Sequence, residues 1–503
     1  VSESSPIFPS IRLLVAILLC LCFIALSVST SNLALSVVCM VKKLPADSSP
    51  SLHSRNSRST NASSESAAEA AALSSSSNAS CPCISGFIFA AQNVGSLMML
   101  LTGPHSDRLN ALSLSFYPSL FLCFFISLCF FLSFSPSLSL FRIMAGMGDA
   151  FLFPSASSMI SRWFPPKERP FALGFVTGGR QIGTLLILPL AGMLCSSSSH
   201  SFGGWPAIFY LSAVIAATVL VIWTILSADK PSKHFFISIR EEEYVGRKIA
   251  EESLGKRTER GSPPWRAILS SRPLFVAVAA LVCHEYPLVI MLQLLPKYFS
   301  DVLQLDSTTN GIVSALPMIA LWLSKTLSSS LASFLTANQR LSKTASCKFF
   351  NLLASLGLGL CVGAVPFITH PAITVVLLCL ANAFAGLHTP GVQTALIQLA
   401  PAYSGIVTGI SFSFVAVVAI FNKILSMVLT EAGSSHGWTI VFEISAVVAL
   451  LPVVFFTLWG SAERQSWASR ERKRDEDEKS ETLSEDTSVV ALAKLSMYLS
   501  HQV

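Results

Sequence analysis

The chain has 503 residues, of which 52% are hydrophobic and only 12% are charged, and its mean hydropathy is +0.62. A soluble globular protein is charged at about a quarter of its positions, so this composition excludes a soluble multidomain enzyme, a disordered chain and a collagen-like fibre. The formal net charge of +6 is modest and does not indicate a nucleic-acid partner. We therefore predict an all-α membrane protein whose main surroundings are the lipid bilayer.

Apolar stretches long enough to cross a bilayer, about 20 residues each, recur along the whole chain. Lipid offers no hydrogen-bond partner to an open backbone, so each stretch is predicted to be a helix. The sequence predicts twelve transmembrane helices, at 11–41, 84–102, 109–134, 137–163, 171–195, 205–227, 273–299, 309–335, 346–368, 371–399, 404–431 and 437–460.

A segment rich in basic and acidic residues, 228–272, divides these helices six and six. The predicted organisation is an N-terminal half (1–227), a cytoplasmic central loop (228–272), a C-terminal half (273–460) and a tail (461–503). A short repeat supports two equivalent halves, because GFVTG opens the fifth helix at 174–178 and GIVTG opens the eleventh at 405–409. Two six-helix halves are typical of transporters with a substrate site at the midplane between them.

The distribution of basic residues sets the orientation. The short loops that follow even-numbered helices hold Arg108, Arg162, Lys167 and Arg169, whereas 135–141 and 196–204 contain no lysine or arginine. Basic short loops stay in the cytoplasm, so both termini are predicted to be cytoplasmic.

The first predicted non-cytoplasmic loop, 43–83, is rich in serine and alanine and is expected to be largely disordered. It contains two glycosylation sequons, at Asn61 and Asn78.

Ionisable side chains inside a span are costly and indicate a functional site. Arg142 and Asp149 in the fourth helix are seven residues apart, close to two turns, so they share one face. The functional hypothesis makes Arg142 the anchor of an anionic substrate and Asp149 a coupling carboxylate, both facing one water-filled cavity. The alternative is a structural ion pair that holds the fourth helix to a neighbour.

Other candidates follow in later helices. Arg180 either faces the cavity or extends toward the cytoplasmic end. His284 and Glu285 form a titratable pair that suits proton-linked transport, or else the histidine simply packs against a helix end. Further candidates are Lys325, His388, Lys423 and Glu431.

The sequence does not contain a phosphate-binding loop, a nucleophile elbow or a zinc-protease motif, so it predicts neither an enzyme nor a bound cofactor. Cys81 and Cys83 form only a C-x-C motif, which is a poor metal signature. The segment GPHSDR at 103–108 resembles the cytoplasmic loop signature of major facilitator transporters, and it makes Asp107 and Arg108 candidates for a conformational gate.

A longer series of motifs resembles solute carrier family 17, the anion:cation symporters that include sialin, vesicular glutamate and nucleotide transporters, and sodium/phosphate cotransporter relatives. The resemblance covers about 84–467 and is carried by RIMAGMGD (142–149), FPS (153–155), WFPPKER (163–169), GT (183–184), PLAGMLC (189–195), GWPAIFY (204–210), IS (237–238), SALP (314–317), APAYSG (400–405) and ERQSW (463–467). It implies the major facilitator fold and transport of an organic or inorganic anion driven by protons, sodium or the membrane potential.

Some positions depart from that family's pattern. The family's span-one arginine is absent, since Thr30 and Ser31 precede Asn32. The usual span-four histidine is Ser157, the arginine of the vesicular glutamate transporters aligns with His284, and the usual aspartate after span eight is Ser333. These departures disfavour glutamate-specific transport. Either Arg180 supplies a charge lost elsewhere, or the substrate or the coupling has changed.

The sequence therefore predicts a monomeric secondary transporter for a small anion, with H⁺ or Na⁺ as the coupling ion and with the plasma membrane or a vesicle or lysosome as its location. The alternatives are an uncoupled facilitator, a carrier of an uncharged solute, and a transporter-like sensor that binds solute without moving it.

Overall fold

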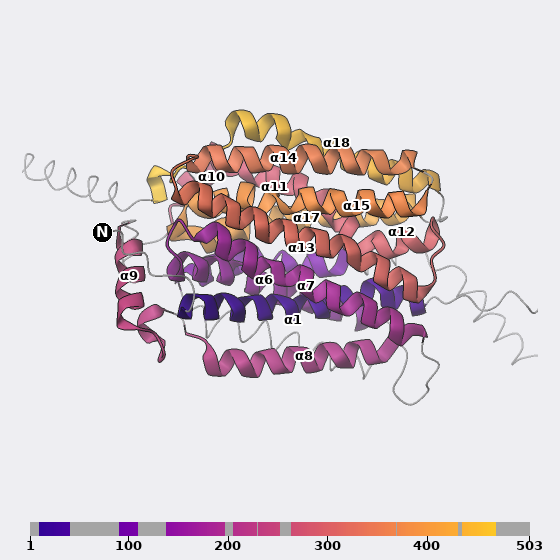
Figure 1. Ribbon diagram of the computed structural model, residues 1–503, viewed down its shortest axis with the longest axis horizontal. Helices are drawn as coiled ribbons and strands as arrows, with labels where there is room; N and C mark the ends of the chain where they lie inside the picture. Colours follow the sequence, from indigo (N-terminus) through magenta and orange to yellow (C-terminus); the bar gives the residue numbers. More distant parts are fainter. Residues whose placement is uncertain are drawn as a thin grey trace, which may run out of the picture.

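The computed structural model describes residues 10–40, 90–108, 137–196, 205–228, 230–251, 263–368, 370–430 and 435–468. These ranges are almost entirely helical, and no strand occurs within them. Long helices lie side by side in one bundle, running in the same or in opposite directions (Figure 1). The all-helical membrane fold predicted from the composition is confirmed.

The first half contains α1 (Ile11–Met40), helical residues 90–96 followed by α4 (Met99–Arg108), α6 (Ser137–Trp163), α7 (Arg169–Ser196) and α8 (Trp205–Leu226). In the second half, three elements form one broken span, namely α11 (Arg272–Val289), the π-helix η4 (Ile290–Leu294) and α12 (Leu295–Asp301).

The remaining elements are α13 (Ser307–Ala337), α14 (Lys343–Ala364) with η5 (Val365–Phe367), then α15 (Pro371–Gly386), the π-helix η6 (Thr389–Gln393) and α16 (Thr394–Leu399), then η7 (Pro401–Tyr403), α17 (Ser404–Leu429), α18 (Ser435–Trp459) and η8 (Ser466–Ala468).

Among the described residues, nine helical segments are long and apolar enough to cross a membrane. They correspond to the predicted first span and to the predicted fifth to twelfth spans. The predicted second and fourth spans fall on α4 with residues 90–96 and on α6. The predicted third span, the loop 43–83 with Asn61 and Asn78, the residue Glu431 and the tail from 469 lie outside the described residues.

The central loop contains more structure than the sequence analysis assigned to it. Its described part includes η2 (Pro231–Lys233), α9 (Ile239–Ala250) and α10 (Trp265–Leu269). Helix α9 lies at one end of the bundle and runs across the direction of the long helices (Figure 1).

The exposure of apolar side chains on the outside of the bundle fits a protein that is surrounded by lipid. Large apolar residues on the outside of the bundle, such as Ile225, Leu327 and Val454, are more than half exposed, because lipid is their expected solvent. The two halves pack together mainly through α7 along α13 and α4 along α17. This arrangement leaves polar side chains from both halves facing one another inside the bundle.

Candidate functional site

A cavity of about 150 Å³ lies between the two halves, enough for on the order of ten water molecules. Side chains from α1, α6 and α7 line it on one side, and side chains from α11, α13, η6 and α17 line it on the other. Four of the lining residues carry a charge, namely Asp149, Arg180, Glu285 and Lys325. The cavity therefore has the contributions from both halves that the repeat predicted.

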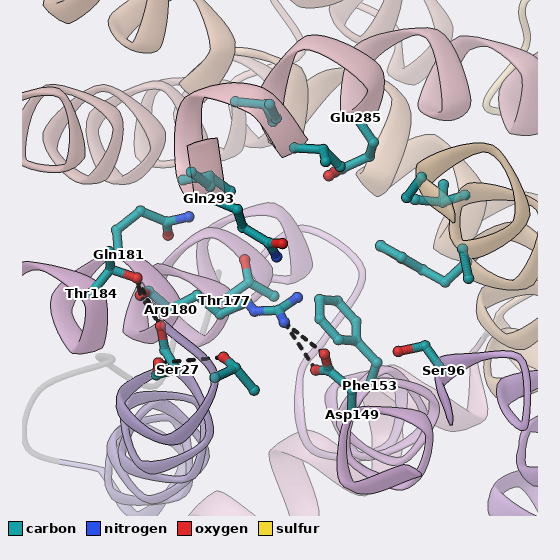
Figure 2. Close-up of a pocket in the computed structure, with 18 of the residues that line it drawn as sticks. Ser27, Ser96, Asp149, Phe153, Thr177, Arg180, Gln181, Thr184, Glu285 and Gln293 are labelled. Atoms are coloured by element: carbon teal, nitrogen blue, oxygen red, sulfur yellow. Dashed lines mark hydrogen bonds and ion pairs between the residues drawn. The ribbon is translucent and has the colours of Figure 1, made fainter. Parts of the chain in front are cut away.

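Asp149 and Arg180 form an ion pair on the first-half side of the cavity. The Nη2 atom of Arg180 donates to both carboxylate oxygens of Asp149, at 3.0 and 2.9 Å. The same guanidinium lies 5.0 Å from the ring centroid of Phe153, a cation–π contact. Figure 2 shows the pair extending toward each other from α7 and α6. A buried carboxylate needs such a partner, because its removal from water is otherwise too costly.

Glycines bring these two side chains into position. A Cβ atom added to Gly146 of α6 would overlap the carbonyl oxygen of Gln92, so α6 packs backbone-to-backbone on residues 90–96. On α7, a Cβ atom at Gly183 would lie 2.6 Å from the carbonyl oxygen of Ile24 in α1. Only glycine permits these close approaches, and they fix the depths at which Asp149 and Arg180 enter the cavity.

The predicted Arg142–Asp149 arrangement requires a correction. Arg142 is missing from the described lining of the cavity, and its Nη1 atom donates instead to the backbone oxygen of Thr30 in α1, at 2.8 Å. The two residues do share a helix face, but seven residues of rise separate them by roughly 10 Å along α6. Arg180, from the neighbouring helix, reaches the carboxylate in its place.

On the second-half side, Glu285 of α11 and Lys325 of α13 line the cavity, and the two interact electrostatically with each other and with Arg180. Figure 2 shows Glu285 extending into the cavity from the opposite side to Asp149 and Arg180. Each half therefore contributes one cation and one carboxylate. Of the predicted group, Asp149, Arg180, His284 and Glu285 are brought together.

His284 also lines the cavity, and behind it lies a second histidine that the sequence analysis had singled out. The rings of His284 and His388 are stacked, with centroids 3.6 Å apart and planes only 3° from parallel. The Nδ1 atom of His284 has no hydrogen-bond partner among the described residues. Two positive charges at this separation would repel strongly, so the stacked pair can hold at most one added proton.

Lys423 of α17 adds a further buried cation near the cavity. Its ammonium group donates to Oδ1 of Asn93, and it interacts electrostatically with Arg142, Asp149 and Arg180. At their formal charges, the ionisable side chains in and around the cavity are then four cations (Arg142, Arg180, Lys325 and Lys423) against two carboxylates (Asp149 and Glu285), an excess of two positive charges. Arg180 and Glu285 are half-buried, and the other four are buried. A low-dielectric interior with this excess attracts an anion.

The residues of the predicted gate lie at the end of the bundle predicted to be cytoplasmic. The carboxylate of Asp107 accepts hydrogen bonds from the backbone nitrogens of Gly405 (3.1 Å) and Ile406 (2.8 Å). These are the first free amides of α17, so the carboxylate caps a helix N-terminus in the opposite half. The side chain of Arg108 lies outside the described residues.

The other copy of the GxVTG repeat makes the symmetry-related contact. Phe171, near the start of α7, donates its backbone N–H to Oγ of Ser333 in α13, at 3.0 Å. A Cβ atom at Gly174 would overlap the hydroxyl of Ser329. Both repeats therefore lie near the start of a helix that meets the opposite half at the same end of the bundle, and both use a glycine for close approach.

One ion cluster was missed from the sequence. Arg12 has a fully buried side chain whose Nη1 atom lies 2.6 Å from Glu168 and whose Nε atom lies 3.1 Å from Glu241 of α9. Glu241 also accepts from the backbone nitrogens of Ile11 and Arg12 at the start of α1.

Burial raises the pKa of Glu168, in the turn between α6 and α7, and the neighbouring Arg12 only partly offsets this rise. Arg12 lies in an apolar stretch that reads simply as a span. The sequence places Arg12 at the start of a predicted helix, but its partners Glu168 and Glu241 are far away in the chain, so the pairing could not be predicted.

Within the described ranges, no group of three or more His, Cys, Asp or Glu side chains is arranged to hold a metal ion. The charged groups of the cavity pair with each other and face a space of small-molecule size. This arrangement can bind a charged or polar solute, and it provides no nucleophile aligned with a base.

Sequence comparison with known proteins assigns the chain to a family. The Major Facilitator Superfamily model matches residues 17–422. Human sialin is 30% identical over 328 residues, which are 65% of this chain and 64% of sialin. Mouse sodium-dependent phosphate transport protein 3 is 31% identical over 328 residues, which are 65% of this chain and 67% of that protein. The chain belongs to solute carrier family 17 of the major facilitator superfamily. It spans slightly less than two thirds of the length of sialin.

Solved structures agree with this assignment at the level of the fold. The structure of the proton:xylose symporter XylE with 6-bromo-6-deoxy-D-glucose bound superposes with a TM-score of 0.63, covering 90% of this chain and 97% of XylE at 14% identity. The expected multi-pass membrane architecture is confirmed, and the family is one of transporters rather than enzymes.

Proposed function

We propose that the protein is a secondary active transporter that moves a small organic or inorganic anion by alternating access, coupled to protons, sodium or the membrane potential. The observation that carries this proposal is the formal excess of two positive charges among the buried and half-buried side chains in and around a cavity shared by both halves. An excess that is buried in a membrane is costly unless an anion neutralises it during the transport cycle. The relatives support the same class, since one of them is named as a sodium-dependent phosphate transport protein.

Coupling in this proposal resides in the Asp149–Arg180 pair. An incoming anion competes with Asp149 for the guanidinium of Arg180, and it does so more easily when a proton or a cation neutralises the carboxylate. Binding of the anion and binding of the coupling ion then favour each other, as reciprocal linkage requires. Lys325 in the opposite half offers a second positive contact, so a bound anion draws the two halves together.

The unit of transport in this proposal is a single chain, because one chain supplies both walls of the cavity. We place both termini in the cytoplasm, on the basis of the basic short loops. The contact between Asp107 and α17 then closes the cytoplasmic end, and its separation opens the cavity to that side.

A carrier of an uncharged polar solute, or an uncoupled facilitator, is the second candidate. One observation favours it. The four charged residues that line the cavity directly sum to zero, and amide side chains such as Gln92, Gln181 and Gln293 lie among them. A neutral, hydrogen-bonding lining suits a polar solute without charge.

The test is uptake into proteoliposomes that contain the purified protein. The panel of radiolabelled solutes includes inorganic phosphate, a dicarboxylate, an amino-acid anion and a sugar acid. Each organic anion is paired with an uncharged analogue. Uptake is measured with an imposed pH gradient, with a sodium gradient and with an imposed voltage. We expect saturable uptake of at least one anion and stimulation by one of the gradients.

Asp149→Asn is then expected to keep counterflow of the anion but to lose the dependence on the coupling gradient. Asp301→Asn is the matched control, because Asp301 is also paired with a cation, Lys297 at 2.5 Å, but lies away from the cavity lining. Uptake of the uncharged analogues alone would establish the second candidate instead. Binding of solute without counterflow would contradict transport and indicate a sensor.

A further inference from the structure

Two aromatic side chains stand exposed next to the central-loop helix. Phe235 is 92% exposed and Phe236 is 65% exposed, although phenylalanine is normally among the more buried residues. Their rings contact each other edge-to-face, with centroids 5.1 Å apart. Ile239, at the first position of α9, is also largely exposed. Three large apolar side chains within five residues are therefore largely exposed, and the contacts of the two rings are to each other and to the neighbouring His234.

The aromatic pair follows a residue that is held against the ends of α6 and α8. The preceding residue, His234, approaches the backbone oxygen of Leu226 with its Nε2 atom, at 3.3 Å, and its ring packs edge-on against Trp163. Leu226 and Trp163 are the last residues of α8 and α6. The chain thus turns back after α8 and holds the two phenylalanines beside the ends of two spanning helices.

The exposed apolar surface continues onto α8. Val221 and Ile225 in the last turns of α8 are 58% and 72% exposed, as expected of residues that contact lipid. Helix α8 lies at the margin of the bundle, and α9 runs across the bundle end (Figure 1). The exposed phenylalanines therefore lie in the chain between the exposed apolar end of α8 and the start of α9.

Basic residues flank the pair within 230–240, whereas Asp229 precedes this segment and Glu241, Glu242 and Glu243 follow it. From 230 to 240 the chain contains Lys230, Lys233 and Arg240 and no acidic residue, and all three basic side chains are exposed. Aromatic rings combined with flanking lysine and arginine are the composition that binds the interface of a membrane rich in anionic lipid.

We propose that residues 230–240 form a peripheral membrane anchor, in which Phe235 and Phe236 insert at the headgroup–acyl boundary while Lys230, Lys233 and Arg240 contact anionic lipid phosphates. The anchor is joined to the transport domain, because its last two residues, Ile239 and Arg240, begin α9 and the next residue, Glu241, is held by Arg12 of α1. Lipid composition then acts on the position of the central loop. The proposal needs only that the chain spans a membrane, and it does not depend on the transported solute.

The depth of Phe235 tests the proposal. A bimane fluorophore is attached to the Phe235→Cys variant of the full chain in nanodiscs that hold one protein each, and the parent protein labelled in parallel gives the background from native cysteines. Quenching by brominated phospholipid is compared with quenching by aqueous iodide. Gly246→Cys is the matched control, since a Cβ atom there meets nothing within 4 Å and the position lies on the exposed face of α9.

We expect iodide to quench the probe at Phe235→Cys about threefold less than at Gly246→Cys, and brominated lipid to show the reverse order. Equal iodide quenching at the two positions would overturn the proposal. Protection that appears only in discs with two copies would also overturn it, in favour of contact between chains.

Charge is tested separately. In the presence of phosphatidylserine, the double variant Lys230→Gln/Lys233→Gln should weaken lipid quenching at the Phe235→Cys probe, because each basic residue near an anionic surface contributes roughly fivefold in affinity. In discs of phosphatidylcholine alone, the double variant should have little effect. An identical loss in both lipids would contradict the role of anionic phosphates, and thermal unfolding of each variant shows whether it remains folded.

Discussion

The pairing of buried charges decides which of them is available to a substrate. Arg180 is held between the carboxylate of Asp149 and the ring of Phe153, so an anion has to displace an existing partner to reach it. Lys325 interacts electrostatically with Glu285 and Arg180, and it makes no direct hydrogen bond to Glu285 in the described part of the chain. In the proposed transport cycle, the second-half cation is therefore the easier first contact for an anion, and Arg180 becomes available once Asp149 is neutralised.

Among individual residues, the Arg12–Glu168–Glu241 cluster is expected to make the free energy of unfolding depend on pH. The pKa of Glu168 is raised above its ordinary value of 4.5, mainly because the carboxyl is buried, so the folded state binds a proton more readily than the unfolded state. The free energy of unfolding contributed by this group therefore falls as pH rises from about 4.5 through the raised pKa, and it is regained on acidification.

Glu168→Gln removes this titration. The free energy of unfolding of the parent minus that of Glu168→Gln should increase as pH is lowered from 7 toward 5, with a slope no steeper than about 1.4 kcal/mol per pH unit, and the difference in melting temperature should increase with it. The measurement is thermal unfolding in detergent over that range. Glu251→Gln is the control, because Glu251 is exposed and pairs with Lys248 on α9. A difference that stays constant with pH would contradict the assigned shift.

At the scale of the helices, two N-termini dock into the opposite half with different chemistry. The start of α17 receives a carboxylate from Asp107, whereas the start of α7 receives only the hydroxyl of Ser333. A negative charge stabilises a helix N-terminus by about 1 kcal/mol. The two symmetry-related contacts that close this end of the bundle are thus unequal, and the α7–α13 contact is the weaker one.

The variant Ser333→Asp should make the α7–α13 contact similar in strength to the contact between Asp107 and α17. The added carboxylate faces the free amides of α7 and should favour the closed state by about 1 kcal/mol, or roughly fivefold in the ratio of closed to open molecules. The readout is the rate at which a polar maleimide, added at this end of the bundle, modifies a Ser96→Cys reporter in the cavity. We expect about fivefold slower labelling.

Ser333→Asn is the matched control, because asparagine has the same size and an oxygen acceptor but no charge. The explanation through the helix N-terminus requires that Ser333→Asn label at close to the parent rate. Equal slowing by both variants would assign the effect to packing, and faster labelling by Ser333→Asp would contradict it.

The sequence predicts helices better than it predicts side-chain partners, for a physical reason. Hydropathy locates a span through a sum over about 20 residues, so 137–163 and 205–227 agree with α6 and α8 to within a residue. The helix α9 was not predicted, because it is only 12 residues long and polar overall, and its position depends on the burial of Val245 and on the long-range pairing of Glu241 with Arg12. In the same way, helical spacing placed Arg142 and Asp149 on one face, but only the depth of α7 beside α6 could reveal that Arg180 is the partner.

At the scale of the whole molecule, the contacts described above belong to one closed end. Asp107 meets α17, Ser333 meets α7, and the hydroxyl of Ser404 lies 3.3 Å from that of Ser161 at the end of α6. Each contact joins the first half to the second. Alternating access by rocking of two rigid halves requires all of them to separate in the same step.

A reversible cross-link between the halves tests this requirement. The hydroxyl oxygens of Ser161 and Ser404 are close enough for the double variant Ser161→Cys/Ser404→Cys to form a disulfide with little backbone movement. Under oxidising conditions, uptake by the double variant in proteoliposomes should fall at least tenfold, because the halves cannot separate at this end, and reduction should restore it. Solute binding should survive, since neither residue lines the cavity. Each single variant under the same oxidation is the control for the native cysteines. Full uptake by a cross-linked double variant would mean that the cavity opens without separation of the halves at Ser161 and Ser404, and rigid rocking would then be wrong for this protein.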